Sequence, residues 1–236
     1  FKPPATGKRL TAVATGLVVG MVALFLAVAA GGGDLSSWVV PGLMVRSGAT
    51  GSISALVLLA LGFGLTLLGR VRAPGYFGFR RPNGWGFLGA IPLAVVFAVA
   101  GGVWWPMDGA SLRGALELLA MISGAAGLEL LARGWLHGSL VKVYPVMLPG
   151  GRHFISVPNG VAALFSSVAI VACFGPTHLP LPGMAGFATP ALWALACLLM
   201  GLLCGGLRER WGSVWASVTV HCSAALVGWF IVDRLF

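Results

Sequence analysis

Four ionisable side chains inside long apolar stretches are the residues of this sequence best suited to chemistry. Glu129 and Arg133 are four residues apart in the segment LELLARG, His178 ends the segment FGPTH, and His221 lies well inside the last apolar stretch. An ionisable group inside a bilayer costs about 2.5–3.5 kcal/mol on insertion scales, so each of them needs a reason. One carboxylate and two imidazoles on separate helices can converge only inside a bundle, which is typical of catalytic and metal-binding sites.

Hydrolysis is the chemistry that these side chains favour. A glutamate shielded from bulk water can act as a general base towards a water molecule, and a histidine can share that role or donate a hydrogen bond to a developing oxyanion. No cofactor is expected. The alternative is a zinc ion held by Glu129, His178 and His221 with one position open for water.

Structural roles compete with the catalytic ones. Glu129 and Arg133 at i, i+4 can form an ion pair that only tethers helices. His178 lies two residues after Pro176, which together with Gly175 breaks a helix, so it can also be an interfacial histidine at a helix end. A histidine at the depth of His221 is harder to explain without a function. The cysteines Cys173, Cys197, Cys204 and Cys222 form no C-x-x-C pair, so neither a disulfide framework nor a zinc ribbon is indicated.

The elements that must position these residues are transmembrane helices. Of 236 residues, 58% are hydrophobic and 9% charged, and the mean hydropathy is +0.95, so lipid must be the solvent for most of the surface. A spanning helix needs about 20 mostly apolar residues. The sequence therefore predicts an all-α polytopic bundle of about seven spans in a single domain, 1–236. The expected spans are 11–30, 51–69, 85–104, 114–133, 159–177, 188–206 and 213–232.

One predicted helical region is too long for a single span. Residues 111–147 would form a rod of about 55 Å, which exceeds the hydrocarbon thickness. We therefore expect a break or a bend at Gly134 or Gly138, followed by a segment along the cytoplasmic interface. His137 and His153 are then expected to be solvated.

The net charge of +9 is explained by membrane topology. In a seven-span arrangement one side carries twelve basic residues and the other carries Arg46, Arg113 and Arg234, which places the N-terminus inside and the C-terminus outside. The basic loop 70–84, with Tyr76, Phe77 and Phe79, is expected to lie on lipid headgroups and not on nucleic acid. The Ala, Gly and Arg bias and the compact loops favour a bacterial inner membrane. The twelve residues are Lys2, Lys8, Arg9, Arg70, Arg72, Arg80, Arg81, Arg133, Lys142, Arg152, Arg208 and Arg210.

Three segments, in order and separation, resemble the motifs of the CAAX-protease and bacteriocin-processing family of glutamic-type intramembrane endopeptidases. They are LELLARG (128–134), FGPTH (174–178) and RERWGSVWASVTVH (208–221). The family motifs are E-E-x-x-x-R, F-x-x-x-H and H-x-x-x-N, and the segment FGFRRP before the third span is also similar. The resemblance makes 75–236 the family core and 1–74 a variable pair of spans.

The resemblance implies roles for the four candidates. Glu129 and His178 would activate a water, Arg133 would orient the acid, and His221 would help to bind the oxyanion. Two positions depart from the family: Leu128 stands where the principal catalytic acid is usual, and Ala225 stands where asparagine is usual. Because neighbouring helix positions point about 100° apart, Glu129 can replace that acid only if the helix is rotated or the site is rearranged.

Depth along the spans raises a further difficulty. With the spans as drawn, His178 falls near the outer face, whereas Glu129 and His221 lie towards the cytoplasm. A later start of the fifth span, or a break at Gly175, would let the three meet. Glu117 is the fallback acid on the outer half, although it can instead pair with Arg113 at i, i+4.

The expected function is endoproteolysis near a membrane-associated, C-terminal segment of a protein substrate. The expected partners are that protein or peptide, with a membrane-embedded or lipidated tail, and membrane lipids. Bacterial sorting proteases, which resemble the family and process C-terminal anchors, are one possible subfamily. The alternative is a catalytically inactive scaffold or immunity-type protein of the same fold. A transporter is less favoured, because no inverted repeat with paired broken helices is visible.

Overall fold

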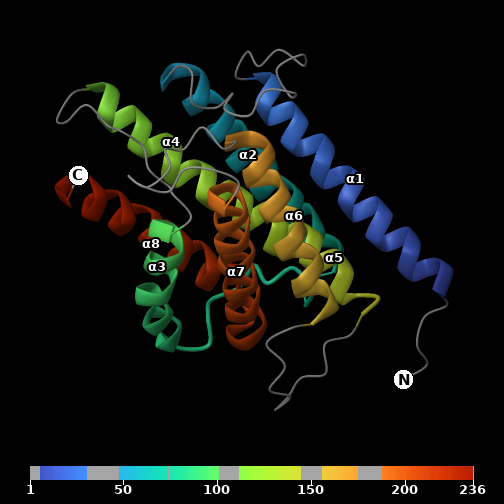
Figure 1. The fold of residues 1–236 in the computed structure, drawn as a ribbon. Helices are drawn as coiled ribbons and strands as arrows, with labels where there is room; N and C mark the ends of the chain where they lie inside the picture. The colour runs from blue at the N-terminus through green and yellow to red at the C-terminus, as the bar shows by residue number, and fades with distance from the viewer. Residues whose placement is uncertain are drawn as a thin grey trace.

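The protein is a bundle of helices (Figure 1). The computed structural model describes residues 6–30, 48–73, 75–100, 112–144, 156–174 and 188–235, and every regular element within these ranges is helical. This confirms the predicted fold class. The elements are α1 (Thr6–Ala30), α2 (Gly48–Arg72), a 3₁₀ turn (Gly86–Ala90) leading into α3 (Ile91–Ala100), α4 (Leu112–Glu129), a π-helical segment (Leu130–Leu136), α5 (His137–Val141), α6 (Val157–Phe174), α7 (Ala188–Trp211) and α8 (Val214–Leu235).

The predicted apolar stretches coincide with these helices. Three segments are long and apolar enough to cross a membrane by length and composition: Leu10–Ala27, Ile53–Arg72 and Leu118–Val141. Large apolar side chains such as Val18, Val96 and Leu164 are at least half exposed, as a lipid-facing surface requires. These features identify an integral membrane protein.

The predicted break at Gly134 or Gly138 is wrong. The helix continues from Leu112 to Val141, with the π-helical segment in place of a break, and α4 and α5 follow one another along one line in Figure 1. The two glycines serve close packing instead. A Cβ atom would lie 2.2 Å from the Thr66 hydroxyl oxygen at Gly134, and 2.7 Å from the Phe77 ring at Gly138.

Glycine also sets the distance between α2 and α4, which pack along each other. A Cβ atom at Gly62 would lie 2.6 Å from the carbonyl oxygen of Gly127, and one at Gly127 would lie 2.6 Å from the backbone nitrogen of Leu59. Such contacts let two backbones approach closely in lipid, where small residues are enriched at helix interfaces.

Two apolar clusters enclose the middle of the bundle. One joins α1, α2, α6 and the helix through the π segment, and includes Leu24, Leu58 and Phe165. The other joins α3, α7 and α8, and includes Met200 and Val220. The candidate residues described below lie where these two groups of helices meet.

Two aromatic side chains of the basic loop between α2 and α3 pack against the helices, and the predicted contact of this loop with lipid headgroups stays a prediction. Phe77 is buried against Trp135, with ring centroids 5.9 Å apart, and Phe79 contacts Phe63 and Trp215. The loop is also fastened to the turn between α7 and α8, where the Val214 backbone N–H donates to the Gly78 carbonyl at 2.8 Å.

Candidate active site

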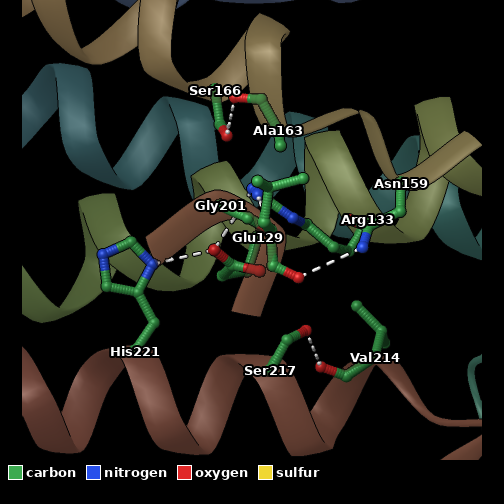
Figure 2. Close-up of polar contacts among 10 residues, drawn as sticks. Glu129, Arg133, Asn159, Ala163, Ser166, Gly201, Val214, Ser217 and His221 are labelled. Carbon is green, nitrogen blue, oxygen red and sulfur yellow. Dashed lines mark hydrogen bonds and ion pairs between the residues drawn. The ribbon is translucent and has the colours of Figure 1, made fainter. Parts of the chain in front are cut away.

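The carboxylate of Glu129 is the centre of the candidate site. Glu129 is the last residue of α4 before the helix widens into the π segment, and it is 1% exposed. Figure 2 shows its side chain between α7 and α8, with Arg133 and His221 directed towards it. Its position at the end of α4 therefore places the acid in the interior of the bundle.

Arg133 connects this acid to α7. Its Nη1 atom lies 3.3 Å from Oε1 of Glu129, and Nη2 donates a hydrogen bond of 2.7 Å to the Gly201 carbonyl. The guanidinium is fully buried. The predicted i, i+4 ion pair is present, and it anchors the acid to the backbone of α7.

His221 approaches the same carboxylate oxygen from α8. Its Nδ1 atom lies 2.8 Å from Oε1 of Glu129. The imidazole is 13% exposed, whereas the carboxylate is 1% exposed. The histidine side of the site is thus the more accessible side. Two of the predicted partners, 92 residues apart in sequence, meet directly.

The π-helical segment has its own stabilising contact. Thr66 on α2 donates a hydrogen bond of 2.8 Å to the carbonyl of Leu130, the first residue of the segment. A π turn interrupts the regular i→i+4 bonding, so an outside donor to a carbonyl at its start compensates for that irregularity. Such turns occur frequently at functional sites.

The structure shows where Leu128 and Ala225, the two residues that depart from the family motifs, lie. Leu128 is 5% exposed and belongs to the apolar cluster with Leu24 and Phe165. A carboxylate at position 128 would enter that cluster, so the acid that meets His221 is Glu129. Ala225, one turn after His221 on α8, is 3% exposed and offers no side-chain donor.

Cys204 is a neighbour that the sequence did not single out. Its thiol sulfur, a carboxylate oxygen of Glu129 and a ring nitrogen of His221 lie within 4.8 Å of one another. Cys204 is fully buried on α7. No spacing relates Cys204 to Glu129 or His221 in the sequence, so only the packing of α4, α7 and α8 reveals the juxtaposition.

The remaining candidates cannot be placed beside this group. His178 and His153 lie outside the described residues, and the side chains of Glu117 and Arg113 are outside the described part as well. His137 was expected to be solvated, and this is wrong: it is fully buried, with Nε2 3.1 Å from Oε1 of Glu209. Because the helix continues past Gly134, His137 stays inside the bundle.

Gly201 makes the approach of Arg133 possible, and this gives a testable prediction. A Cβ atom there would lie 2.7 Å from Nη2 of Arg133 and 3.0 Å from Cα of Ala163. We expect Gly201→Ala to lower the free energy of unfolding by about 1–3 kcal/mol, as overpacking does. Unfolding in mixed micelles, followed by far-UV circular dichroism, measures the change.

Gly160→Ala is the matched control for Gly201→Ala. Gly160 is also helical, and a Cβ atom there would meet nothing within 4 Å. The Gly160→Ala variant should have an unfolding midpoint equal to or higher than that of the wild type, because alanine has a higher helix propensity than glycine. Equal stability of the two variants would contradict the tight contact at Gly201.

One oxygen of the Glu129 carboxylate is available for chemistry. Among the residues that the structure describes, Oε1 of Glu129 is contacted by Arg133 and His221, while Oε2 is buried without a hydrogen-bond partner. An ionised carboxylate oxygen without a protein donor can accept a hydrogen bond from a water molecule or bind a cation. Both are properties of a hydrolytic or metal site.

Comparison with known proteins supports the resemblance found in the motifs. Residues 114–227 match the family model described as type II CAAX prenyl endopeptidase, Rce1-like. No curated protein and no solved structure matches the chain. The match begins in α4 and ends in α8, so it includes Glu129, Arg133, Cys204 and His221. The boundary of the family core at residue 75 stays a prediction. Residues 114–227, just under half of the chain, are therefore similar to the Rce1-like CAAX endopeptidases, which are a family of proteases.

Proposed function

We propose that this protein is an intramembrane endopeptidase that hydrolyses a peptide bond near a membrane-associated, C-terminal segment of a protein substrate. The observation that carries the proposal is the buried carboxylate of Glu129, which is held on one oxygen by Arg133 and His221 and has no hydrogen-bond partner on the other. The family match is the second support, since the family model is that of a CAAX endopeptidase.

The geometry suits a glutamate that acts as general base. A water molecule beside Oε2 gives a proton to Glu129 while its oxygen attacks the carbonyl carbon of the peptide bond. The tetrahedral oxyanion accepts a hydrogen bond from the ring of His221, whose Nδ1 faces Glu129. The C–N bond then breaks as Glu129 returns the proton to the leaving amine, so no proton is lost or gained over the cycle.

Arg133 is a positioning residue in this mechanism. Its bond to the Gly201 carbonyl fixes the guanidinium, and the guanidinium in turn fixes Oε1 of Glu129. Since Oε1 is already occupied, Oε2 is the oxygen left for the water. The roles of Glu129, Arg133 and His221 follow the motif resemblance, with His178 as a further member proposed from the sequence.

The test uses purified protein in lipid nanodiscs and a small substrate panel. It contains a farnesylated CAAX peptide, the same peptide without the lipid, and a peptide with an apolar transmembrane tail, all in buffer with EDTA. Mass spectrometry should detect one new C-terminus in a substrate with a lipid or transmembrane tail, and little cleavage of the unmodified peptide. Cleavage only when zinc is restored would replace the metal-free mechanism with the zinc alternative.

A non-catalytic scaffold or immunity-type protein is the second candidate function. Its support is the loss of the family acid at Leu128, together with a polar network that joins α4, α7 and α8. The two candidates differ in what Glu129→Gln changes. A protease loses cleavage and stays folded, whereas a scaffold loses stability and has no cleavage to lose.

We further propose a bacterial cytoplasmic membrane as the location, with the N-terminus inside and the C-terminus outside. The asymmetry of basic residues across the predicted loops supports this orientation. Alkaline phosphatase fused after Phe236 is therefore expected to be active, and green fluorescent protein fused at the same position is expected to be dark. The opposite pair of results would reverse the topology or change the number of spans.

A further inference from the structure

Three helices each contribute one metal-ligating side chain to the same small volume. Glu129 comes from the end of α4, Cys204 from the middle of α7, and His221 from α8, and their ligand atoms lie within 4.8 Å of one another. Side chains held by different packed helices keep their relative positions without a loop to fold around a ligand. The trio is preformed in the way that metal sites in helical bundles are.

The unpartnered oxygen of Glu129 points to a ligand in this volume. Its residue is 1% exposed, and Oε2 has no hydrogen-bond partner among the described residues. A buried carboxylate oxygen without a donor is costly, because desolvation is not repaid. A cation, or a water bound to one, supplies the missing interaction.

We propose that Glu129, Cys204 and His221 form a binding site for a zinc-type divalent cation. A carboxylate oxygen, a thiolate sulfur and an imidazole nitrogen are the ligand types that zinc takes, with bonds of about 2.0–2.3 Å. Bonds of that length require the ligand atoms to move together by about 1 Å from their present spacing. The fourth position opens on the side of His221, the partly exposed member of the trio.

The nearby arginine determines which oxygen binds the ion. Arg133 lies 3.3 Å from Oε1, so the cation takes Oε2. The charge of Arg133 is balanced by Glu129, and the thiolate of Cys204 supplies a further negative charge. Metal binding therefore releases the thiol proton to solvent and leaves a cation ligated by one carboxylate, one thiolate and one neutral imidazole.

The sulfur ligand distinguishes this site from the zinc site that the motifs alone suggested, which used His178. The other described cysteines are not members of this trio. Cys222 directs its sulfur to the carbonyl of Ile122 at 3.7 Å, and Cys197 lies two turns earlier on α7. A thiolate at the centre favours zinc, cobalt or copper over magnesium and calcium.

Titration with Co²⁺ tests the site directly, because a thiolate ligand gives cobalt an intense near-ultraviolet charge-transfer band. We expect metal-free protein in nanodiscs to show this band at one equivalent of Co²⁺ and to lose it when Zn²⁺ is added. Cys204→Ser should abolish the band, and Glu129→Gln and His221→Ala should weaken Co²⁺ binding by more than about tenfold. Cys197→Ser, a buried cysteine on the same helix, should keep the band.

The outcomes of the Co²⁺ titration can be distinguished from those of the protease assay. Absence of the band in the wild-type protein, or an unchanged band in Cys204→Ser, would overturn the metal site whether or not any substrate is cleaved. Cys204→Ala, with its fold checked by size-exclusion chromatography, serves if the serine variant unfolds. Only the effect of the metal on cleavage rests on the proposed function. An ion bound to Oε2 prevents Glu129 from taking a proton from water, so zinc should lower the cleavage rate.

Discussion

Glu129→Gln is expected to lower kcat/KM by about 10²–10⁴-fold, the usual contribution of a general base. Glutamine has the same shape and keeps a hydrogen bond to Arg133 or to His221, but it cannot take a proton from water. The loss should therefore appear mainly in kcat, with KM nearly unchanged. Cleavage of the best substrate in the nanodisc panel, measured under single-turnover conditions, gives the number.

Glu209→Gln is the matched control for this substitution. Glu209 is also a buried glutamate paired with a histidine, since Nε2 of His137 lies 3.1 Å from its carboxylate. It lies five residues beyond Cys204 on α7, and its partners are His137 and Ser156 and not residues of the proposed site, so cleavage should continue near the wild-type rate. A folded Glu129→Gln protein that cleaves as fast as the wild type would eliminate Glu129 as the base.

Arg133→Met is expected to lower the free energy of unfolding by about 3–5 kcal/mol, the range for breaking a buried ion pair by removing one partner. Methionine fills similar space, but it leaves the charge of Glu129 uncompensated in the bundle and the Gly201 carbonyl without its donor. Unfolding in mixed micelles, monitored by circular dichroism, measures the difference.

A double-mutant cycle separates the ion pair from general loss of packing. The combined variant Glu129→Gln, Arg133→Met has no buried charge left at this position, so it should recover part of the stability lost by Arg133→Met alone. Additive losses in the cycle would mean that the two side chains do not interact. The cycle also tests the scaffold alternative. If the network is purely structural, Glu129→Gln should lower the free energy of unfolding as much as Arg133→Met does.

The sequence was most informative about the helices. Apolar length is a local property that follows directly from the thickness of the hydrocarbon layer, so each predicted span has a helix in the structure. The ion pair of Glu129 and Arg133 was equally local, because helical periodicity fixes the i, i+4 neighbour.

Features that depend on packing between distant helices were missed. The sequence predicts a helix break at Gly134 or Gly138, whereas these glycines admit Thr66 and Phe77 against a continuous helix. The prediction that His137 is solvated depends on that break, so it is wrong for the same reason. Cys204 had no pattern to mark it, since its partners are on other helices.

The motif resemblance agrees with the family model that residues 114–227 match, but it left the identity of the acid open. The choice between positions 128 and 129 depends on how α4 is rotated about its axis, and sequence alone does not fix that rotation. The structure directs Leu128 into the apolar cluster and Glu129 towards His221. His178 remains a prediction.

The π-helical segment also bears on how such proteins can diverge. A π turn is an α-helix with one residue inserted, and each inserted residue turns everything beyond it by about 100°. The half of the helix before Leu130 and the half after it can therefore change orientation independently by gaining or losing a single codon. Because Gly134 and Gly138 admit Thr66 and Phe77 at close range, such a rotation would also require the packing beyond the π segment to be rebuilt.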